Sequence, residues 1–364
     1  MNKHHNKKLS EQVMVITGAT SGIGLCTARE AVKKGARVVL AARNEDALKD
    51  ICHELNSAEN NAVYVVADVG DEQAVQKVAD KAIETFGGFD TWVNNAGIVV
   101  YSELEDLPSE DHQQIFQTNY WGVVYGSQAA LAHYKQRDGG GVIINVASIN
   151  AQMPVPVIGA YSASKAAVKA YSDVLRMELS HNKEQVEVTV IMPSGIATPI
   201  SEHARTYTGD EGKVMPPLYD PTLVADAILT AAQKKIRDVT IGESGKMSVM
   251  GWTAFPAMMS KFLGYALPKA QSTGDEPSAG DSLFSPDKDG DVYLGGKRHG
   301  IPVSPYTKAR LHPWVTFGLG LAAASAVTLC VARKRNPRKF NKQIKKGKHH
   351  IQEGTHRVMK RFKS

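Results

Sequence analysis

The stretch Val13-Met14-Val15-Ile16-Thr17-Gly18-Ala19-Thr20-Ser21-Gly22-Ile23-Gly24 begins as an apolar strand, turns through glycines and continues into a helical pattern. A strand that turns onto a helix N-terminus directs backbone N–H groups and the positive helix end at a pyrophosphate. Gly18 permits the tight turn, Gly22 the approach of the phosphate, and Gly24 the close packing of helix on strand. An ordinary glycine-rich turn is the alternative interpretation. The candidate contacts are Thr17, Gly18, Ser21, Gly22, Ile23 and Gly24.

Outward from this stretch, short β-branched runs alternate with longer helical patterns as far as residue 245. The alternation is typical of βαβ units, and the nearly continuous apolar runs indicate strands that helices cover on both faces. We therefore predict an α/β fold, a Rossmann-type doubly wound parallel sheet of about seven strands, with a C-terminal extension. The predicted strands are Val13–Thr17, Arg37–Ala41, Ala62–Ala67, Asp90–Val93, Val142–Val146, Val186–Met192 and Asp238–Ile241, and the predicted helices cover 22–34, 44–57, 71–86, 109–135, 159–181 and 220–235.

Polar residues follow the second and third predicted strands. Arg43 lies where a site for NAD usually has an acid for the ribose 2′-OH. An arginine there accommodates a 2′-phosphate, so the sequence favours NADP(H) over NAD(H). A solvated arginine at the start of a helix is the alternative. Asp68, which precedes Val69, is placed to bond the adenine edge, to cap the next helix, or to do both.

Tyr161 and Lys165 lie four residues apart, on one face of a predicted helix. A free tyrosine has a pKa of about 10 and is a poor base, and a lysine ammonium one turn away is expected to lower that pKa. Ser148 follows the strand Val142–Val146, so we expect its hydroxyl at the carboxyl edge of the sheet, donating a hydrogen bond to a substrate oxygen. With Asn119, these residues are the candidate catalytic set. A Tyr-x-x-x-Lys spacing alone is usually a helix-surface pair, but behind this serine and this glycine turn it predicts proton transfer.

On these motifs the chain resembles the short-chain dehydrogenase/reductase family, in its compact single-domain branch, over roughly residues 11–245. Thr17-Gly18-x-x-x-Gly22-Ile23-Gly24 matches its cofactor motif, and Asn94-Asn95-Ala96-Gly97 matches its fourth-strand motif. The resemblance implies hydride transfer between a nicotinamide cofactor and an alcohol/carbonyl pair. It implies Tyr161 as acid/base, Ser148 as the residue that orients the carbonyl, Lys165 on the nicotinamide ribose and Asn119 holding a relay water.

The segment Pro193-Ser194-Gly195-Ile196-Ala197-Thr198 resembles the family's segment that holds the nicotinamide carboxamide, with Ile196 and Thr198 in contact. Ser194 departs from the family pattern, which has glycine there, and this puts the local loop geometry in question. The further cofactor contacts that the resemblance implies are Asp68, Val69, Asn95, Ala96, Gly97, Tyr161, Lys165, Pro193, Ile196 and Thr198.

Composition divides the rest of the chain. Residues 246–268 are apolar and Met-rich and predict one or two helices over the substrate side, whereas residues 269–305 have the composition of a loop or linker. We expect five segments: a polar arm (1–10), the catalytic domain (11–245), a substrate-side extension and linker (246–312), an apolar segment (313–332) and a basic tail (333–364). The tail carries a net charge of +12, which leaves −6 on the remaining chain.

Substrate contacts are expected from residues 149–158 and 201–218. The first segment is apolar and stiff, and the second has the mixed composition of a mobile lid. Tyr207 and Tyr219 are candidates to face the substrate, with packing or surface roles as the alternative. The apolar lining favours a lipophilic carbonyl compound.

Within the apolar segment, the uncharged run of 18 residues Trp314–Val331 is long enough to cross a bilayer, about 27 Å at 1.5 Å per residue, but Gly, Ala, Ser and Thr make its insertion marginal. Crossing would also export the basic tail from a cytoplasmic catalytic domain, against the positive-inside tendency. We therefore favour an enzyme with its catalytic domain in the cytoplasm whose residues 313–364 dip into or lie on a membrane. The alternative is a core or oligomer helix followed by a solvated tail, and the family resemblance is compatible with a homo-oligomer.

Two other functions are alternatives to an enzyme at a membrane. One is a cofactor-binding scaffold or sensor without turnover, which has no chemical need for both Tyr161 and Lys165. The other is a soluble enzyme whose tail binds an acidic partner, although no nucleic-acid-reading motif accompanies the charge. Cys26, Cys52 and Cys330 lie far apart, which predicts neither a disulfide framework nor a metal site and favours a reducing compartment. The polar start of the chain contains no secretory signal pattern.

Overall fold

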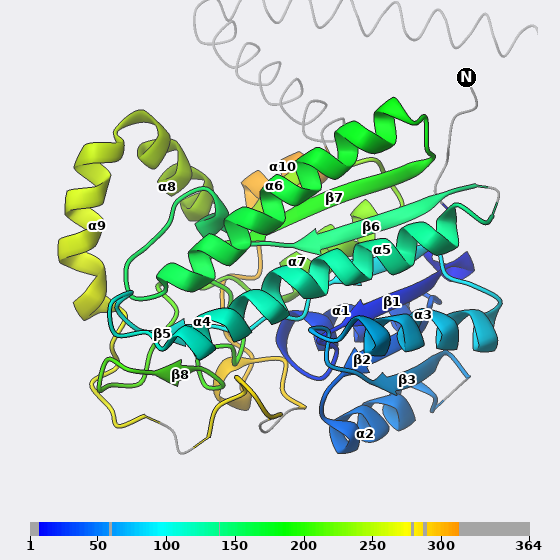
Figure 1. The fold of residues 1–364 in the computed structure, drawn as a ribbon, viewed down its shortest axis with the longest axis horizontal. Helices are drawn as coiled ribbons and strands as arrows, with labels where there is room; N and C mark the ends of the chain where they lie inside the picture. The colour runs from blue at the N-terminus through cyan, green and yellow to red at the C-terminus, as the bar shows by residue number, and fades with distance from the viewer. Residues whose placement is uncertain (1–6, 58–59, 138, 278–279, 287–289, 313–364) are drawn as a thin grey trace, which may run out of the picture. The chain divides into compact units, whose positions relative to one another are not determined.

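The computed structural model describes residues 7–57, 60–137, 139–277, 280–286 and 290–312. Within these ranges a seven-stranded parallel sheet has the order β3-β2-β1-β4-β6-β7-β9 (Figure 1). The strand order reverses between β1 and β4, so the predicted doubly wound Rossmann-type fold is confirmed. The strands are β1 Val13–Thr17, β2 Arg37–Ala42, β3 Ala62–Val66, β4 Thr91–Asn94, β6 Gly141–Val146, β7 Val186–Pro193 and β9 Asp238–Ile241. A separate pair of two-residue strands, β5 Val100–Tyr101 and β8 Arg205–Thr206, was not predicted.

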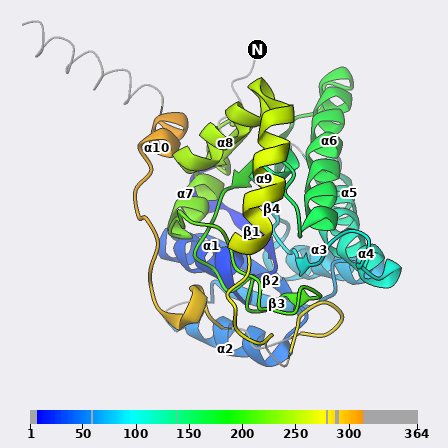
Figure 2. The same ribbon diagram turned by 90° about the vertical axis from the view of Figure 1, so that its left-hand side faces the viewer.

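Helices cover both faces of the sheet, as Figure 2 shows. The helices are α1 Gly22–Lys33, α2 Glu45–Leu55, α3 Glu72–Phe86, α4 Ser109–Phe116, α5 Gly122–Tyr134, α6 Gly159–His181 and α7 Thr222–Ala231. Alternate residues of β1 face the two layers: Met14 and Ile16 pack in the core with α1, α2 and α7, and Val13 and Val15 in the core with α3, α5 and α6. Because both faces are buried, the strand needs apolar residues throughout rather than alternation.

The predicted helix over residues 109–135 is interrupted in the structure. Between α4 and α5 lies a π-helical turn, Gln117–Trp121, that contains the candidate catalytic residue Asn119. Such turns within α-helices frequently lie at functional sites, because the extra residue redirects a side chain. The α-helical periodicity of the sequence does not reveal this insertion.

The extension after β9 packs on the sheet domain, and most of its chain between α9 and α10 is irregular. It contains α8 Glu243–Ala254, α9 Pro256–Ala270, the short 3-10 turn η4 Leu294–Gly296 and α10 Pro305–Leu311. Between α9 and α10 it passes the cofactor end of the fold, where Gly22 N–H donates to Asp291 O at 2.9 Å. Leu283, only 2% exposed, packs in a buried cluster there. Residue 245 lies inside α8, and the chain up to Leu311 forms one compact unit.

The apolar segment 313–332 and the basic tail 333–364 lie outside the described residues. No helix within the described ranges combines the length and the apolar character needed to cross a bilayer. Cys26 and Cys52 are free thiols, and Cys330 also lies outside the described part.

Candidate active site

The glycine turn between β1 and α1 is held by hydrogen bonds with the residues that directly follow the neighbouring strand β4. Thr17 Oγ1 accepts from the backbone N–H groups of Asn95 and Ala96 at 3.0 and 3.1 Å. Asn95 Nδ2 donates to the carbonyls of Thr17 and Gly18 at 3.0 and 3.2 Å. Thr17 is buried, so it positions the turn rather than lining the cavity beside it.

Two glycines of this turn are required by its geometry. Gly22 has a φ of 50°, in the left-handed region that other residues rarely adopt. A Cβ on Gly24 would lie 2.0 Å from the carbonyl oxygen of Gly18, far inside van der Waals contact. The helix N-terminus therefore approaches the strand as closely as the sequence motif predicts, and its N–H groups are suited to a phosphate.

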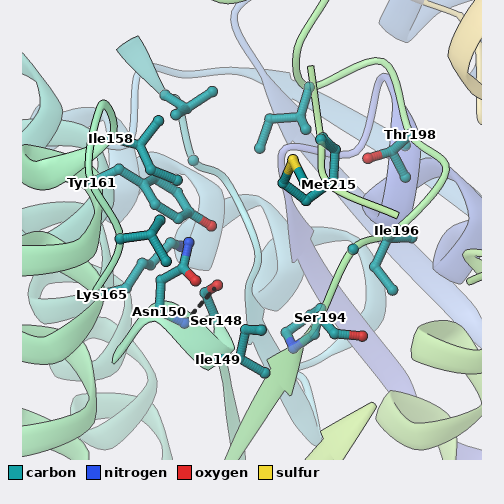
Figure 3. Close-up of a pocket in the computed structure, with 18 of the residues that line it drawn as sticks. Ser148, Ile149, Asn150, Ile158, Tyr161, Lys165, Ser194, Ile196, Thr198 and Met215 are labelled. Carbon is teal, nitrogen blue, oxygen red and sulfur yellow. Dashed lines mark hydrogen bonds between the residues drawn. The ribbon is translucent and has the colours of Figure 1, made fainter. Parts of the chain in front are cut away.

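Ser148, Tyr161 and Lys165 lie together in the lining of a cavity of about 410 Å³ at the carboxyl edge of the sheet (Figure 3). Ser148 follows β6 and its hydroxyl accepts from Asn150 N–H at 3.2 Å. Tyr161 and Lys165 come from successive turns of α6, with the lysine Nζ 5.7 Å from the centre of the tyrosine ring. Figure 3 shows the tyrosine hydroxyl directed into the opening.

Asn119 is completely buried beside this group. Its Oδ1 accepts from Ile98 N–H at 2.8 Å, and its Nδ2 donates to Ile98 O at 2.9 Å and to Ser164 Oγ at 3.1 Å. A Cβ on Gly97 would lie 3.2 Å from Asn119 Oδ1 and 3.3 Å from Lys165 Nζ. The structure therefore brings all four candidate catalytic residues together, with Gly97 between two of them.

The protonation of the pair differs from the expectation. Burial raises the pKa of Tyr161, and a hydrogen bond with Ser148 lowers it to a smaller extent. Burial also lowers the pKa of the Lys165 amine to about 8. Lys165 is not among the causes that shift the pKa of Tyr161. Its Nζ donates to the carbonyl of Val146 at 3.0 Å.

The alternatives for Arg43 and Asp68 are decided in part. Arg43 is not a solvated arginine: its guanidinium donates to the backbone carbonyls of Ser282 and Leu283 in the extension. Asp68 does not cap the following helix, because Asp71 is the N-cap of α3 and accepts from Gln73 N–H at 2.8 Å. The Asp68 carboxylate instead accepts from Gly70 N–H at 2.8 Å. Val69 is buried beside it.

The departure at Ser194 is accommodated by its neighbours. Its hydroxyl donates to Ile241 O at 2.7 Å. A Cβ on Gly242 would lie 2.6 Å from Ser194 Oγ, and one on Gly245 would lie 2.7 Å from Ser194 Cβ. The serine therefore fits because glycines stand opposite it, and the segment still lines the cavity through Pro193, Ile196 and Thr198.

The cavity runs from the glycine turn past Tyr161 to a mostly apolar wall. Both predicted substrate segments contribute to it, but Tyr207 and Tyr219 do not. Tyr207 donates to Asp111 Oδ2 at 2.8 Å, and Tyr219 donates to Glu243 Oε2 at 3.0 Å. The lining residues from those segments are Ile149, Asn150, Met153, Val155, Ile158, His203, Lys213, Val214, Met215, Pro216 and Pro217.

Other lining residues were not singled out from the sequence. Tyr101 comes from β5, and Leu263, Leu267 and Gln271 come from α9 and its C-cap. Leu263, Leu267 and Gln271 follow one another at intervals of four residues, and this spacing in the sequence indicates that they share one face of a helix. Ser282, further along the extension, also lines the cavity.

Comparison with known proteins agrees with this geometry. Residues 12–208 match the family model for short chain dehydrogenases. The chain is 39% identical over 329 residues to the uncharacterized oxidoreductase YxnA of Bacillus subtilis, covering 89% of this chain and 92% of that protein. It is 33% identical over 193 residues to the NADP-dependent (R)-specific alcohol dehydrogenase of Lentilactobacillus kefiri, covering 53% of this chain and 76% of that enzyme. A solved short-chain dehydrogenase/reductase from Burkholderia phymatum in complex with NAD is similar with a TM-score of 0.62 at 25% identity, over 69% of this chain and 96% of that one.

The fold and these matches define a nicotinamide-dependent class of oxidoreductases. The chain belongs to the short-chain dehydrogenase/reductase family.

Proposed function

We propose that this chain transfers hydride between NADP(H) and a lipophilic alcohol/carbonyl compound, with Tyr161 as the proton donor or acceptor. The observation that carries the proposal is that Ser148, Tyr161 and Lys165 line the same cavity as the glycine turn. The nicotinamide cofactor supplies the hydride donor or acceptor when bound. The chain's own residues supply the binding site, the orientation and the proton.

Each side chain has a separate task in this proposal. Ser148 donates a hydrogen bond to the substrate oxygen, and Tyr161 exchanges a proton with that oxygen. Burial raises the pKa of Tyr161, so its hydroxyl is protonated at neutral pH and can donate its proton to a carbonyl oxygen. Lys165 lies where it can hold the nicotinamide ribose, and Asn119 fixes the backbone at Ile98 and supports a proton relay.

The cofactor contacts follow the residues of the cavity. Gly18, Ser21, Gly22 and Ile23 are assigned to the pyrophosphate, because they line the cavity at the N-terminus of α1. Gly22 N–H donates to Asp291 O, so a bound pyrophosphate would take the place of that contact. Asn95, Ala96 and Gly97 fit the ribose side, and Pro193, Ile196 and Thr198 the nicotinamide. Asp68 and Val69 are assigned to the adenine end.

Turnover with medium-chain methyl ketones, followed by the loss of NADPH absorbance, tests the chemistry. The Tyr161→Phe variant should lose activity by about 10²–10⁴-fold, because general acid–base catalysis contributes that much. The matched control is Tyr207→Phe, whose hydroxyl bonds Asp111 outside the cavity and which should retain activity. A folded wild-type protein that binds the cofactor but turns over no carbonyl or alcohol would support the scaffold or sensor instead.

The preference for NADP(H) rests on Arg43, and the NADP-dependent relative from Lentilactobacillus kefiri supports it. We expect NADPH to bind at least about tenfold more tightly than NADH, a difference of about 1.4 kcal/mol. Arg43 also holds the extension through the carbonyls of Ser282 and Leu283. The Arg43→Ala variant therefore distinguishes a ligand of the 2′-phosphate from a purely structural anchor. A phosphate ligand predicts weaker binding of NADPH alone, whereas a purely structural anchor predicts equal loss for NADPH and NADH with a lower Tm.

Association of residues 313–364 with a membrane is the second part of the proposal and rests on their sequence. Pelleting of the full chain with anionic vesicles, beside a chain that ends at Leu311, tests it. Equal pelleting of both would remove the anchor.

A further inference from the structure

Gln271 holds an unpaired polar atom in the interior of the protein. The residue is 4% exposed, and its Oε1 is the single buried side-chain N or O atom without a hydrogen-bond partner among the described residues. An unpaired buried acceptor destabilises the folded state, and native proteins pair nearly all such atoms. An oxygen left in this state at a ligand cavity suggests that the ligand pairs it.

Gln271 lines the same cavity as Tyr161 but belongs to another element. Leu263, Leu267 and Gln271 follow one another at intervals of four residues along and just after α9, so they share one helix face. All three line the cavity. The wall that α9 presents is therefore apolar except for one carboxamide at its end.

The backbone fixes the place of this carboxamide. Gln271 N–H donates to Leu267 O at 2.9 Å, and Gln271 O accepts from Lys213 N–H at 2.8 Å. These bonds tie the end of α9 to the lining segment that continues through Met215. A residue whose backbone is held on both sides and whose side chain is buried is suited to selecting a ligand, because little ordering remains to be done on binding.

We propose that Gln271 is a specificity-determining residue that accepts a hydrogen bond from a hydroxyl or N–H group of the substrate, remote from the reacting carbon. The substrate class is an amphipathic carbonyl compound with an apolar body and a polar donor at its other end. This inference rests on the proposed function, because it concerns the substrate of the same site. A site built around such a bond discriminates against the analogue that lacks the donor, since the acceptor is then left unpaired.

The test uses pairs of methyl ketones of about six to ten carbons, one ending in a methyl group and the other in a hydroxyl group. At the chain length that reaches Gln271, the wild type should prefer the hydroxyl-ended ketone by tenfold or more in kcat/KM, mainly through KM. The Gln271→Met variant should lose that preference while its Tm stays equal or rises, because an unpaired oxygen has been removed. The control Gln233→Met, whose amide bonds only Leu229 O outside the cavity, should keep the preference.

Three outcomes would overturn the inference. They are no preference at any chain length, equal losses of Gln271→Met on both ketones, or a fall in Tm that shows a structural role. If the wild type turns over neither ketone, the proposed function fails, and the dissociation constants of the two ketones, measured by calorimetry on wild type and Gln271→Met, decide the inference separately. Tighter binding of the hydroxyl-ended ketone that Gln271→Met abolishes would support it, and equal binding would refute it.

Discussion

Replacing Gly24 by alanine tests how closely α1 approaches the glycine turn. Two effects oppose each other in this variant. Alanine in a helix is favoured over glycine by about 0.5–1 kcal/mol. The new Cβ, however, would lie 2.0 Å from Gly18 O and 2.7 Å from Asn95 Nδ2. Because the nearest neighbour is backbone, it cannot rotate away, and overpacking of this kind costs about 1–3 kcal/mol.

The cost of overpacking therefore exceeds the gain in helix propensity. The free energy of unfolding should fall by about 1–2 kcal/mol and the Tm by a few degrees. Movement of the Gly18 carbonyl also displaces the N–H groups assigned to the pyrophosphate. We expect NADPH to bind at least about tenfold more weakly, which is about 1.4 kcal/mol. Thermal unfolding and an NADPH fluorescence titration measure the two effects.

Gly264 supplies the matched control, because it also lies in a helix, α9, but a Cβ there would meet nothing within 4 Å. Gly264→Ala should leave NADPH affinity unchanged and leave the Tm equal or higher. A Gly24→Ala protein with unchanged Tm and unchanged NADPH affinity would refute the reasoning, since the helix could not then approach the turn so closely.

Three further substitutions give predictions. Because burial lowers the Lys165 pKa from 10.5 to about 8, the folded chain binds fewer protons there than the unfolded chain. As the pH rises from about 8 to 10.5, the free energy of unfolding of the wild type should therefore increase by on the order of 3 kcal/mol relative to that of Lys165→Met. Urea denaturation of the two proteins across this pH range measures the difference, and parallel pH profiles would contradict the prediction. Asn94→Leu should lower the free energy of unfolding by about 2–6 kcal/mol, because Trp92 Nε1 and Asn145 Oδ1 lose their hydrogen bonds to the Asn94 side chain, of 2.7 and 2.8 Å. A decrease of less than about 1 kcal/mol in urea denaturation would contradict this. Ser194→Gly should lower the free energy of unfolding by about 1–2 kcal/mol, since a hydrogen bond is lost and a flexible residue gained; kcat should stay within about threefold of wild type, and a larger loss would show that the hydroxyl acts in catalysis.

Much of the fold follows from local sequence pattern. The apolar runs and the helices between them predict the seven strands of the main sheet, and the helix Gly159–His181 has the bounds that were predicted. The pair β5–β8 escaped prediction because two-residue strands carry no periodicity. The π-helical turn around Asn119 escaped it because one inserted residue does not disturb the apolar spacing enough to be seen.

The site divides in the same way. The glycine turn, the Tyr161–Lys165 spacing and the family can be read from the sequence alone, because these features depend on residues close together in the chain. The role of the extension, in contrast, depends on how the chain folds back on itself. It places Gln271 in the cavity wall, directs Tyr207 and Tyr219 elsewhere, and sets Ser282 against Arg43. These contacts join residues far apart in the chain, and no local periodicity encodes which distant surface a loop will cover.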